Sequence, residues 1–263
     1  MRLAIEAILD YDFAEPSDVL LAVEAAALPD QRVIEQTHII DNAGPLTNKV
    51  GGSGVGRRTW TRTGTGRMLS TYRATVDVDR APVDLASLSK SPLPSLPEDV
   101  LPFIWPSRYC EADRFGSFVS GHFANLEGGA LVDALLNWVH ENIAYVPGSS
   151  GIATTAADTF VAQQGVCRDF AHLTAALIRS RDIPARLVSV YALDLDPPDF
   201  HAVVEVWLDG AWHMVDATRL APVETMVRIA VGRDATDIAF MTIFGGAQMN
   251  AQSIRVSRVA DPG

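Results

Sequence analysis

Three residues in the second half of the 263-residue chain, Cys167, His201 and Asp216, could together perform nucleophilic chemistry. A cysteine nucleophile needs a base to take its proton and a third group to orient that base, and an imidazole and a carboxylate can fill these two roles. The resulting thiolate attacks an acyl carbon and forms a thioester. Whether this chain does so depends on the elements that carry the three side chains.

We expect Cys167 to lie in the first turn of a helix. Apolar residues recur at the helical period from Val166 to Leu177, which predicts one buried stripe. Gly165 precedes this segment and Pro184 follows it, as is typical of helix boundaries. The first N–H groups of a helix have no intrahelical partner, and the positive end of the helix dipole lies there. Both effects favour a thiolate at Cys167.

A hairpin is predicted around the dipeptide Asp209-Gly210, because two strand-like segments, 202–208 and 211–217, flank it. Asp-Gly between alternating apolar residues is typical of a two-residue hairpin turn. Such a turn fixes the register, so that the residues on either side of the dipeptide pair with each other.

This register places His201 and Asp216 on one face of the hairpin as diagonal neighbours, with Cβ atoms about 7–8 Å apart. His213 falls on the opposite face. We expect the face that carries His201 to pack against the start of the cysteine helix, where the imidazole would reach Cys167. The backbone N–H of Cys167 is one candidate donor to an oxyanion. For the second donor, Tyr145 and Gln164 remain open.

The motifs around these residues resemble those of the bacterial transglutaminase-like superfamily, over roughly residues 105–263. They are Gly165-Val166-Cys167-Arg168-Asp169-Phe170-Ala171-His172-Leu173, His201-Ala202-Val203-Val204-Glu205-Val206, Val215-Asp216-Ala217-Thr218 and Val231-Gly232-Arg233-Asp234-Ala235-Thr236-Asp237.

The resemblance implies a papain-like catalytic triad of Cys167, His201 and Asp216 with no cofactor, as in the transglutaminase-like cysteine proteases. Two positions depart from the usual motifs. Val203 stands where an aromatic residue is usual, and Ala217 stands where proline is common. Neither change removes a catalytic group, but both would alter the acyl-binding cleft.

The predicted fold class is α+β, with a transglutaminase-like core of helices packed on an antiparallel sheet, preceded by an all-β, sandwich-like domain. Period-2 alternation and turn signals predict β-structure through the first hundred residues. A proline-rich connector over about 82–106 carries apolar residues, so it should pack down on a surface. We therefore expect a β-rich domain over 1–104 and the core over 105–263. Within the core, the expected helices are 131–143, 156–163 and the cysteine helix, and the expected strands are 185–193, 202–208, 212–215, 227–231 and 253–259.

Composition narrows the classes of function. Hydrophobic residues make up 48% of the chain, enough for a sizeable core. The net charge of −11 argues against nucleic acid or an anionic membrane as the main partner. The first residues lack the apolar region of a signal peptide, and two cysteines do not make a disulfide framework. We expect a cytoplasmic protein, without a particular oligomeric state being indicated.

Other chemistry-bearing residues are interpreted as structural. Cys110 is expected to be a buried core cysteine, and His172 a hydrogen-bonded structural histidine. The chain lacks the closely spaced ligand pairs of structural zinc sites, so no metal is predicted. The glycine-rich stretch 51–58 lacks the Gly-Lys-Ser/Thr of a phosphate loop and is expected to be a hairpin loop.

The function predicted from these residues is a cysteine-dependent hydrolase of amide or peptide bonds, with a peptide or protein substrate. An alternative uses the same thioester but lets an amine take the acyl group, as a protein-glutamine transglutaminase does, or acts as an amidase. A third interpretation is a non-catalytic peptide-binding module.

Overall fold

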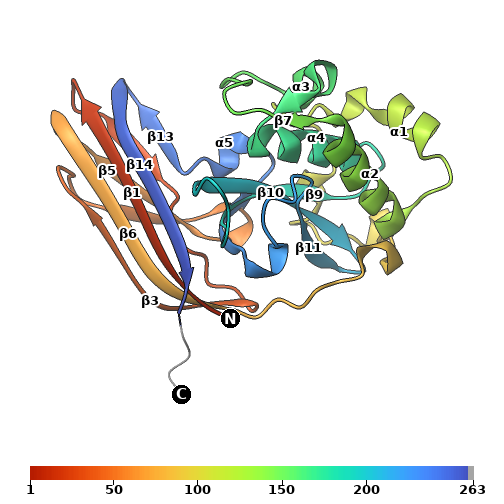
Figure 1. Ribbon diagram of the computed structural model, residues 1–263, viewed down its shortest axis with the longest axis horizontal. Helices are drawn as coiled ribbons and strands as arrows, with labels where there is room; N and C mark the ends of the chain where they lie inside the picture. The colour runs from red at the N-terminus through yellow and green to blue at the C-terminus, as the bar shows by residue number, and fades with distance from the viewer. Residues whose placement is uncertain (260–263) are drawn as a thin grey trace.

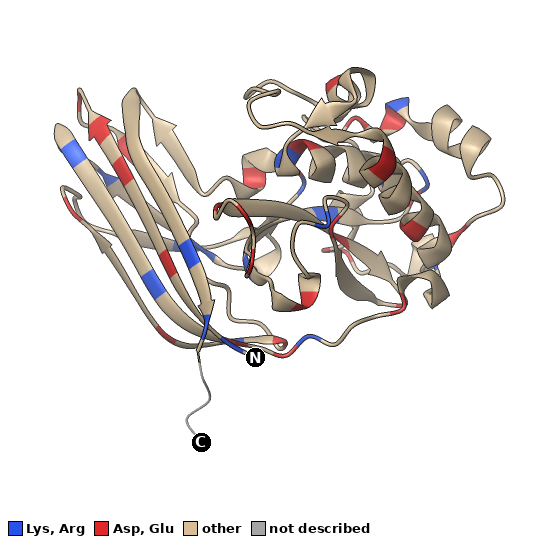
Figure 2. Cartoon of the chain, in the orientation of Figure 1, with Lys and Arg blue, Asp and Glu red and all other residues tan. Residues whose placement is uncertain are grey.

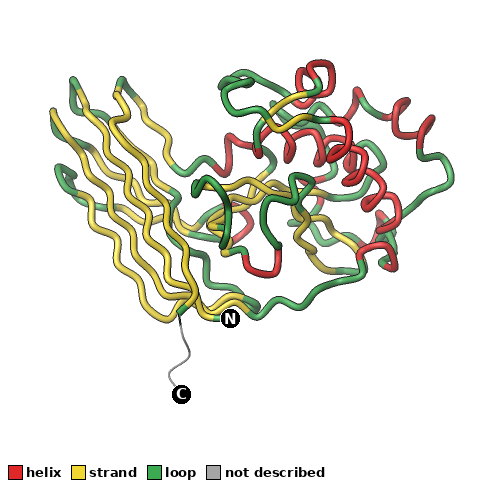
Figure 3. Tube along the Cα trace, in the orientation of Figure 1, coloured by secondary structure: helices red, strands yellow, loops and turns green. Residues whose placement is uncertain are grey.

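The computed structural model describes residues 1–259. Figure 1 shows strands gathered at one end of the molecule and most helices at the other, with a further sheet between them. The secondary structure in Figure 3 follows the same division. This mixed architecture confirms the predicted α+β class.

Two four-stranded antiparallel sheets form the β-rich part. One has the order β14-β1-β6-β3 and the other the order β13-β2-β5-β4. Alternate residues of the longest strands are buried, and both sheets contribute to a shared apolar cluster, which confirms the sandwich-like prediction. The strands are β1 (Arg2–Phe13), β2 (Asp18–Leu21), β3 (Gln31–Ile40), β4 (Thr47–Val50), β5 (Arg57–Arg62), β6 (Gly66–Val78), β13 (Met241–Phe244) and β14 (Ala247–Arg258). The glycine-rich stretch 51–58 connects β4 to β5, as expected of a hairpin loop.

The last two strands of the chain return to the β-rich part. β14 pairs with β1 along almost its whole length, and β13 pairs with β2. The last two strands of the expected core, 105–263, therefore belong to the two sheets of the β-rich part and not to the central sheet. β14 covers an edge of β1 that would otherwise present unpaired backbone groups. Alternation can identify such a strand, but it carries no information about a partner more than two hundred residues away.

The sheet that carries the candidate site has the order β11-β10-β9-β12, all antiparallel. Its strands are β9 (Ala185–Tyr191), β10 (Phe200–Leu208), β11 (Ala211–Val215) and β12 (Val227–Gly232). The helices are α1 (Gly116–His122), α2 (Gly128–Asn142), α3 (Ala156–Ala162), α4 (Cys167–Arg179) and the short α5 (Ala235–Ile238). α2, α3 and α4 share one apolar cluster with this sheet, which confirms the predicted packing of helices on an antiparallel sheet.

Both faces of the central sheet are buried, so the molecule has layers. On one face, Val204 and Val206 of β10 pack with the helices. On the other, Val203 packs in a cluster that includes Ala26 and Val55 from the β-rich part. Every residue of β9 is buried, as expected of a strand covered on both sides.

The connector over about 82–106 holds three 3-10 turns, at Leu85–Ser87, Leu93–Ser95 and Leu101–Phe103, and an isolated β-bridge from Lys90 to Leu208. It packs down as expected. A Cβ added at Gly129 in α2 would lie 1.7 Å from the Leu85 carbonyl oxygen, so glycine is needed where the connector crosses that helix. Phe103 is buried against the ring of Trp212, whereas Trp105 is exposed.

Acidic and basic side chains are spread along both parts of the chain (Figure 2). Within residues 1–259, no helix has the length and apolar character needed to cross a membrane. In the same residues, no group of three or more His, Cys, Asp or Glu side chains is placed to hold a metal ion.

Candidate active site

Cys167 is the first residue of α4, as the sequence predicted, and is half-buried. The start of this helix is held by the buried carboxylate of Asp169, which accepts a hydrogen bond of 2.8 Å from the Val166 N–H. The Ser150 hydroxyl donates to the same carboxylate. A Cβ on Gly165 would lie 2.7 Å from the Asp169 Cβ, so this close approach requires glycine. Asp169 therefore caps the start of this helix.

The predicted hairpin register is confirmed, because Leu208 pairs with Ala211 and Val204 with Val215. His201 is the second residue of β10, and Asp216 directly follows β11. The His201 Nε2 donates to Asp216 Oδ2 over 2.8 Å, and both side chains are almost fully buried.

Thr218 fixes the other side of the Asp216 carboxylate, a role that the sequence reasoning missed. The Thr218 N–H donates to Oδ1 and its hydroxyl to Oδ2, each over 2.8 Å. Each carboxylate oxygen is thus held by at least one donor. The signal available in the sequence was a hydroxyl residue two positions after the aspartate, facing His201 in the hairpin register.

The expected packing face of the hairpin was wrong. The residues that pack with α4 are Ala202, Val204 and Val206, which alternate with His201. Because both faces of this sheet are buried, alternation could not reveal which face the helix covers. His201 still interacts with Cys167. Cys167 lies at the start of α4 and His201 near the start of β10, so the two side chains meet at the edge of the sheet where β10 begins.

The contacts of His201 determine its charge. Burial alone lowers its pKa, but the hydrogen bonds to Asp216 and Cys167, together with the charges of these groups, outweigh burial and raise that pKa from 6.5 to about 9. His201 therefore carries a proton at neutral pH. An imidazolium held between a carboxylate and a thiol can donate its proton to a leaving group.

Tyr145 lies against the same cysteine. It belongs to β7 (Ala144–Tyr145), which pairs in parallel with β8 (Gln164–Gly165) just before α4. The Val146 N–H donates to the Gly165 carbonyl oxygen over 2.9 Å, which fixes the strand that carries the phenol.

The Tyr145 phenol interacts with both the backbone N–H and the thiol of Cys167. Burial and the neighbouring Cys167 raise the pKa of Tyr145 to about 12, so its hydroxyl remains a donor. Of the two residues considered for the second oxyanion donor, Tyr145 is the one that contacts Cys167 among residues 1–259. Gln164 is exposed, and its side chain has no hydrogen bond to Cys167 within residues 1–259.

Cys110 and His172, which the sequence analysis interpreted as structural, both lie in the core. Cys110 is fully buried, which raises its pKa to about 12. His172 is also fully buried, accepts the Ala235 N–H at its Nε2 over 3.1 Å and stacks on Tyr109. Burial lowers the pKa of His172 to about 4. The expectations for both residues are confirmed.

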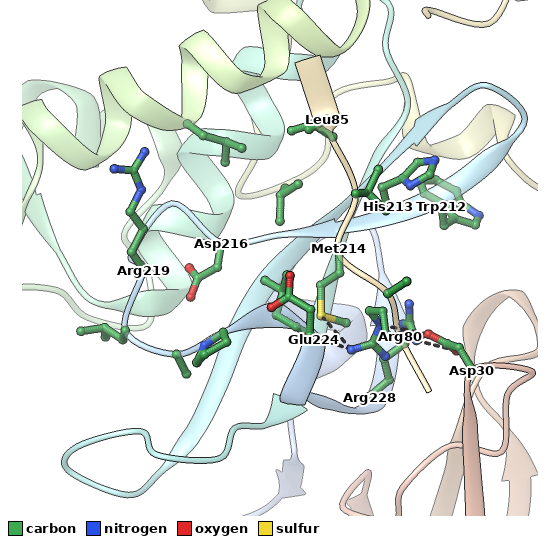
Figure 4. A pocket seen from close by; sticks show the side chains of 18 residues that line it. Asp30, Arg80, Leu85, Trp212, His213, Met214, Asp216, Arg219, Glu224 and Arg228 are labelled. Atoms are coloured by element: carbon green, nitrogen blue, oxygen red, sulfur yellow. Dashed lines mark hydrogen bonds and ion pairs between the residues drawn. The ribbon is translucent and has the colours of Figure 1, made fainter. Parts of the chain in front are cut away.

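A cavity of about 560 Å³ lies behind the His201–Asp216 pair. Figure 4 shows Asp216 and Arg219 on one side of it and Arg80 with Arg228 on the other. Cys167 and His201 do not line this cavity, so it is separate from the place where an acyl group would meet the thiol.

Comparisons with known proteins agree with this fold. Residues 124–217 match the family model of the transglutaminase-like superfamily, a range that includes all three predicted site residues. The crystal structure of the "Putative Cysteine Protease from Cytophaga hutchinsonii" is 35% identical in sequence, with a TM-score of 0.93 over 98% of this chain and 90% of that one.

Two mycobacterial proteins are also similar over part of the chain. An uncharacterized protein of Mycobacterium leprae is 33% identical over 126 residues, which is 44% of each chain. One from Mycobacterium tuberculosis is 31% identical over 81 residues, 31% of this chain and 26% of that protein. The matches thus span less than half the length of these curated relatives. The family model and the similarity along nearly the whole Cytophaga hutchinsonii chain establish the family, and this chain belongs to the transglutaminase-like superfamily.

Proposed function

We propose that the chain is a cysteine-dependent hydrolase of amide or peptide bonds, with Cys167 as nucleophile, His201 as general acid and base, and Asp216 as the group that orients the imidazole. One observation carries the proposal: His201 donates to Asp216 over 2.8 Å while it interacts with Cys167. The description of the Cytophaga hutchinsonii protein as a "Putative Cysteine Protease" supports hydrolysis in particular.

In the first half of the proposed reaction, the Cys167 thiolate attacks the carbonyl carbon and the carbonyl oxygen gains negative charge. We assign the donation to this oxygen to the Cys167 N–H and the Tyr145 hydroxyl, which contact each other at the start of α4 and would both turn to the substrate. The His201 imidazolium gives its proton to the amide nitrogen as the carbon–nitrogen bond breaks. The amine leaves, and the acyl group remains on sulfur as a thioester.

In the second half, the now neutral His201 takes a proton from water, and the oxygen of that water attacks the thioester carbon. The carbon–sulfur bond breaks, the acid leaves, and the thiolate and imidazolium are restored. Asp216 accepts the hydrogen bond of His201 and stabilises the imidazolium in both halves. A primary amine in place of water would give transglutamination from the same thioester.

Amine release from a peptide library tests this proposal. We expect Cys167→Ala to lose activity by about 10³-fold or more, because the only nucleophile in the scheme is removed. Cys110→Ala is the matched control. It should retain activity, since the Cys110 thiol is fully buried and takes no part in the proposed reaction. Equal activity of wild type and Cys167→Ala would refute the proposal.

The same reaction run with a labelled primary amine separates hydrolysis from acyl transfer. Free acid without label is the result expected for a hydrolase. Incorporation of the label in preference to release of the acid would instead identify a transglutaminase. If wild type releases neither product, and Cys167 is alkylated by iodoacetamide at pH 6 no faster than Cys110, the chain is a binding module.

A further inference from the structure

The cavity beside Asp216 takes no part in the proposed reaction. Its volume of about 560 Å³ lies in the range of roughly 300–1,000 Å³ that is typical of sites for small molecules. Segments 80–85 and 212–224 supply most of its lining, and apolar side chains such as Leu85 and Trp212 cover much of the wall. Such a wall favours an occupant with an apolar body.

One guanidinium in the wall of this cavity, that of Arg80, has an unused donor. Its Nε donates to Asp30 over 2.9 Å, and its Nη1 donates to the carbonyl oxygens of Val223 over 2.6 Å and Met226 over 2.9 Å. These bonds hold the guanidinium in place. Its Nη2 is buried and has no hydrogen-bond partner among residues 1–259. Because buried donors in native proteins are nearly always paired, this one indicates an acceptor that the chain itself does not supply.

The ion pairs around Arg80 leave one positive charge without a counter-charge. Arg80, Arg186 and Arg228 share two carboxylates, those of Asp30 and Glu205. Three positive charges against two negative ones give this largely buried cluster a net charge of +1. Burial, together with the charge of Arg228, lowers the pKa of Arg80, so the carboxylate of Asp30 compensates the Arg80 charge only in part. An anion in the cavity would supply the missing negative charge.

We propose that this cavity is a binding site for a small organic carboxylate, whose carboxylate oxygen accepts a hydrogen bond from Arg80 Nη2 and whose apolar body packs against Leu85 and Trp212. A carboxylate brings the one negative charge that the cluster lacks, and it binds guanidinium groups with strong, directional hydrogen bonds. Asp216 lies on the side of the cavity away from Arg80 (Figure 4), so the carboxylate end of the ligand faces Arg80. Glu224 also lines the cavity, but the hydrogen-bond partners of Arg80 among residues 1–259 do not include it.

This inference does not depend on the proposed function, because neither Cys167 nor His201 lines the cavity. Binding is therefore the measurement that tests it, and the result stands whether or not the protein hydrolyses amides.

Calorimetric titration of the full chain with three probes tests the two parts of the site. The probes are 4-phenylbutyrate, the neutral 4-phenylbutanol, and acetate, which lacks an apolar body. We expect 4-phenylbutyrate to bind about tenfold or more tightly than the alcohol, as one charge-assisted hydrogen bond would give, and also more tightly than acetate. Equal affinity of 4-phenylbutyrate and the alcohol, or no binding of 4-phenylbutyrate at millimolar concentration, would overturn the inference.

Leu220→Glu tests where the ligand binds. Leu220 lines the cavity and is 36% exposed, so the variant adds a negative charge there without removing a buried side chain. It should weaken the binding of 4-phenylbutyrate by about tenfold, because like charges repel. Leu93→Glu is the matched control, since Leu93 is 43% exposed on the connector and does not line the cavity. Equal affinities of the two variants would place the ligand elsewhere and overturn the inference.

Two further variants test the partner of the carboxylate. Arg80→Gln, once circular dichroism shows that it is folded, should bind 4-phenylbutyrate no more tightly than the alcohol. If this variant does not fold, Glu224→Gln replaces it. Glu224→Gln removes a negative charge from the cavity and should tighten the binding of 4-phenylbutyrate severalfold while leaving that of the alcohol unchanged. Unchanged affinity for 4-phenylbutyrate in the variant that is measured would overturn the inference.

Discussion

At the scale of single residues, the site depends on an imidazole that holds its proton. His201 lies between the carboxylate of Asp216 and the thiol of Cys167, and the two contacts raise its pKa to about 9 despite its burial. The residue types and their spacing were readable from the sequence, because hairpin register is set by a two-residue turn. The role of Thr218 was not, since it depends on how the Asp216 carboxylate lies in the folded hairpin.

This pKa predicts the pH dependence of the reaction. The activity should fall as pH rises through about 9, where His201 loses the proton that the leaving amine needs. Asp216→Asn removes a charge that favours the imidazolium, so the fall should move to lower pH and the maximal rate should drop. The profile of kcat/KM against pH for both proteins measures this. A high-pH limb at the same position in both would contradict the assignment.

The same shift has a consequence for stability. A histidine whose folded pKa lies above its unfolded value of about 6.5 contributes stability that is complete below pH 6.5 and is lost as pH rises through about 9. Between these pH values, the free energy of unfolding of wild type should therefore decline as His201 loses its proton. This contribution to the decline should be absent in His201→Ala, as denaturant unfolding at a series of pH values would measure.

At the scale of elements, helix α4 is positioned by its first turn. The periodic apolar stripe predicted the helix and the Asp-Gly dipeptide predicted the hairpin, because both signals are local. The face of the sheet that the helix covers was predicted wrongly, since a sheet buried on both sides is apolar on both sides. The two-residue pairing of β7 with β8, which holds Tyr145 against Cys167, is too short to leave a pattern in the sequence.

Gly165→Ala tests how tightly this first turn is packed. The added Cβ would meet the Asp169 Cβ at 2.7 Å, so the backbone must shift or the buried carboxylate must move. We expect a loss of about 1–3 kcal/mol in the free energy of unfolding, together with lower activity. Gly121→Ala in α1 is the control, because no atom lies within 4 Å of its added Cβ. Denaturant unfolding of the two variants makes the comparison, and equal stabilities would show that the turn is not tightly constrained.

At the scale of the whole molecule, the β-rich part and the transglutaminase-like core are joined by a largely buried charge cluster. Glu205 of the central sheet is fully buried between two arginines, with a distance of 2.7 Å to Arg186 and a close contact to Arg228. Arg228 also pairs with Asp30 in the β-rich part at 2.7 Å, and Asp30 pairs with Arg80, which lies between β6 and the connector. No local pattern could predict this cluster, because its five members come from five separate segments of the chain.

Glu205→Gln should destabilise the protein strongly. It leaves Arg186 and Arg228 with less compensating charge in a buried site, and breaking a buried ion pair by removing one partner typically costs about 3–5 kcal/mol. Glu98→Gln, at an exposed position of the connector, is the matched control and should change stability by less than about 0.5 kcal/mol. Thermal and denaturant unfolding measure both. Similar small effects for the two variants would mean that the cluster does not hold the parts together.

The central claim is that an acyl group is carried on Cys167, and trapping that intermediate tests it most directly. A reaction with a good peptide or amide substrate is quenched in acid during turnover, and the intact protein and its proteolytic fragments are weighed by mass spectrometry. The account predicts one acyl adduct, located on Cys167 and released by neutral hydroxylamine, as expected of a thioester. Turnover that proceeds with no adduct, or with an adduct on another residue, would contradict it.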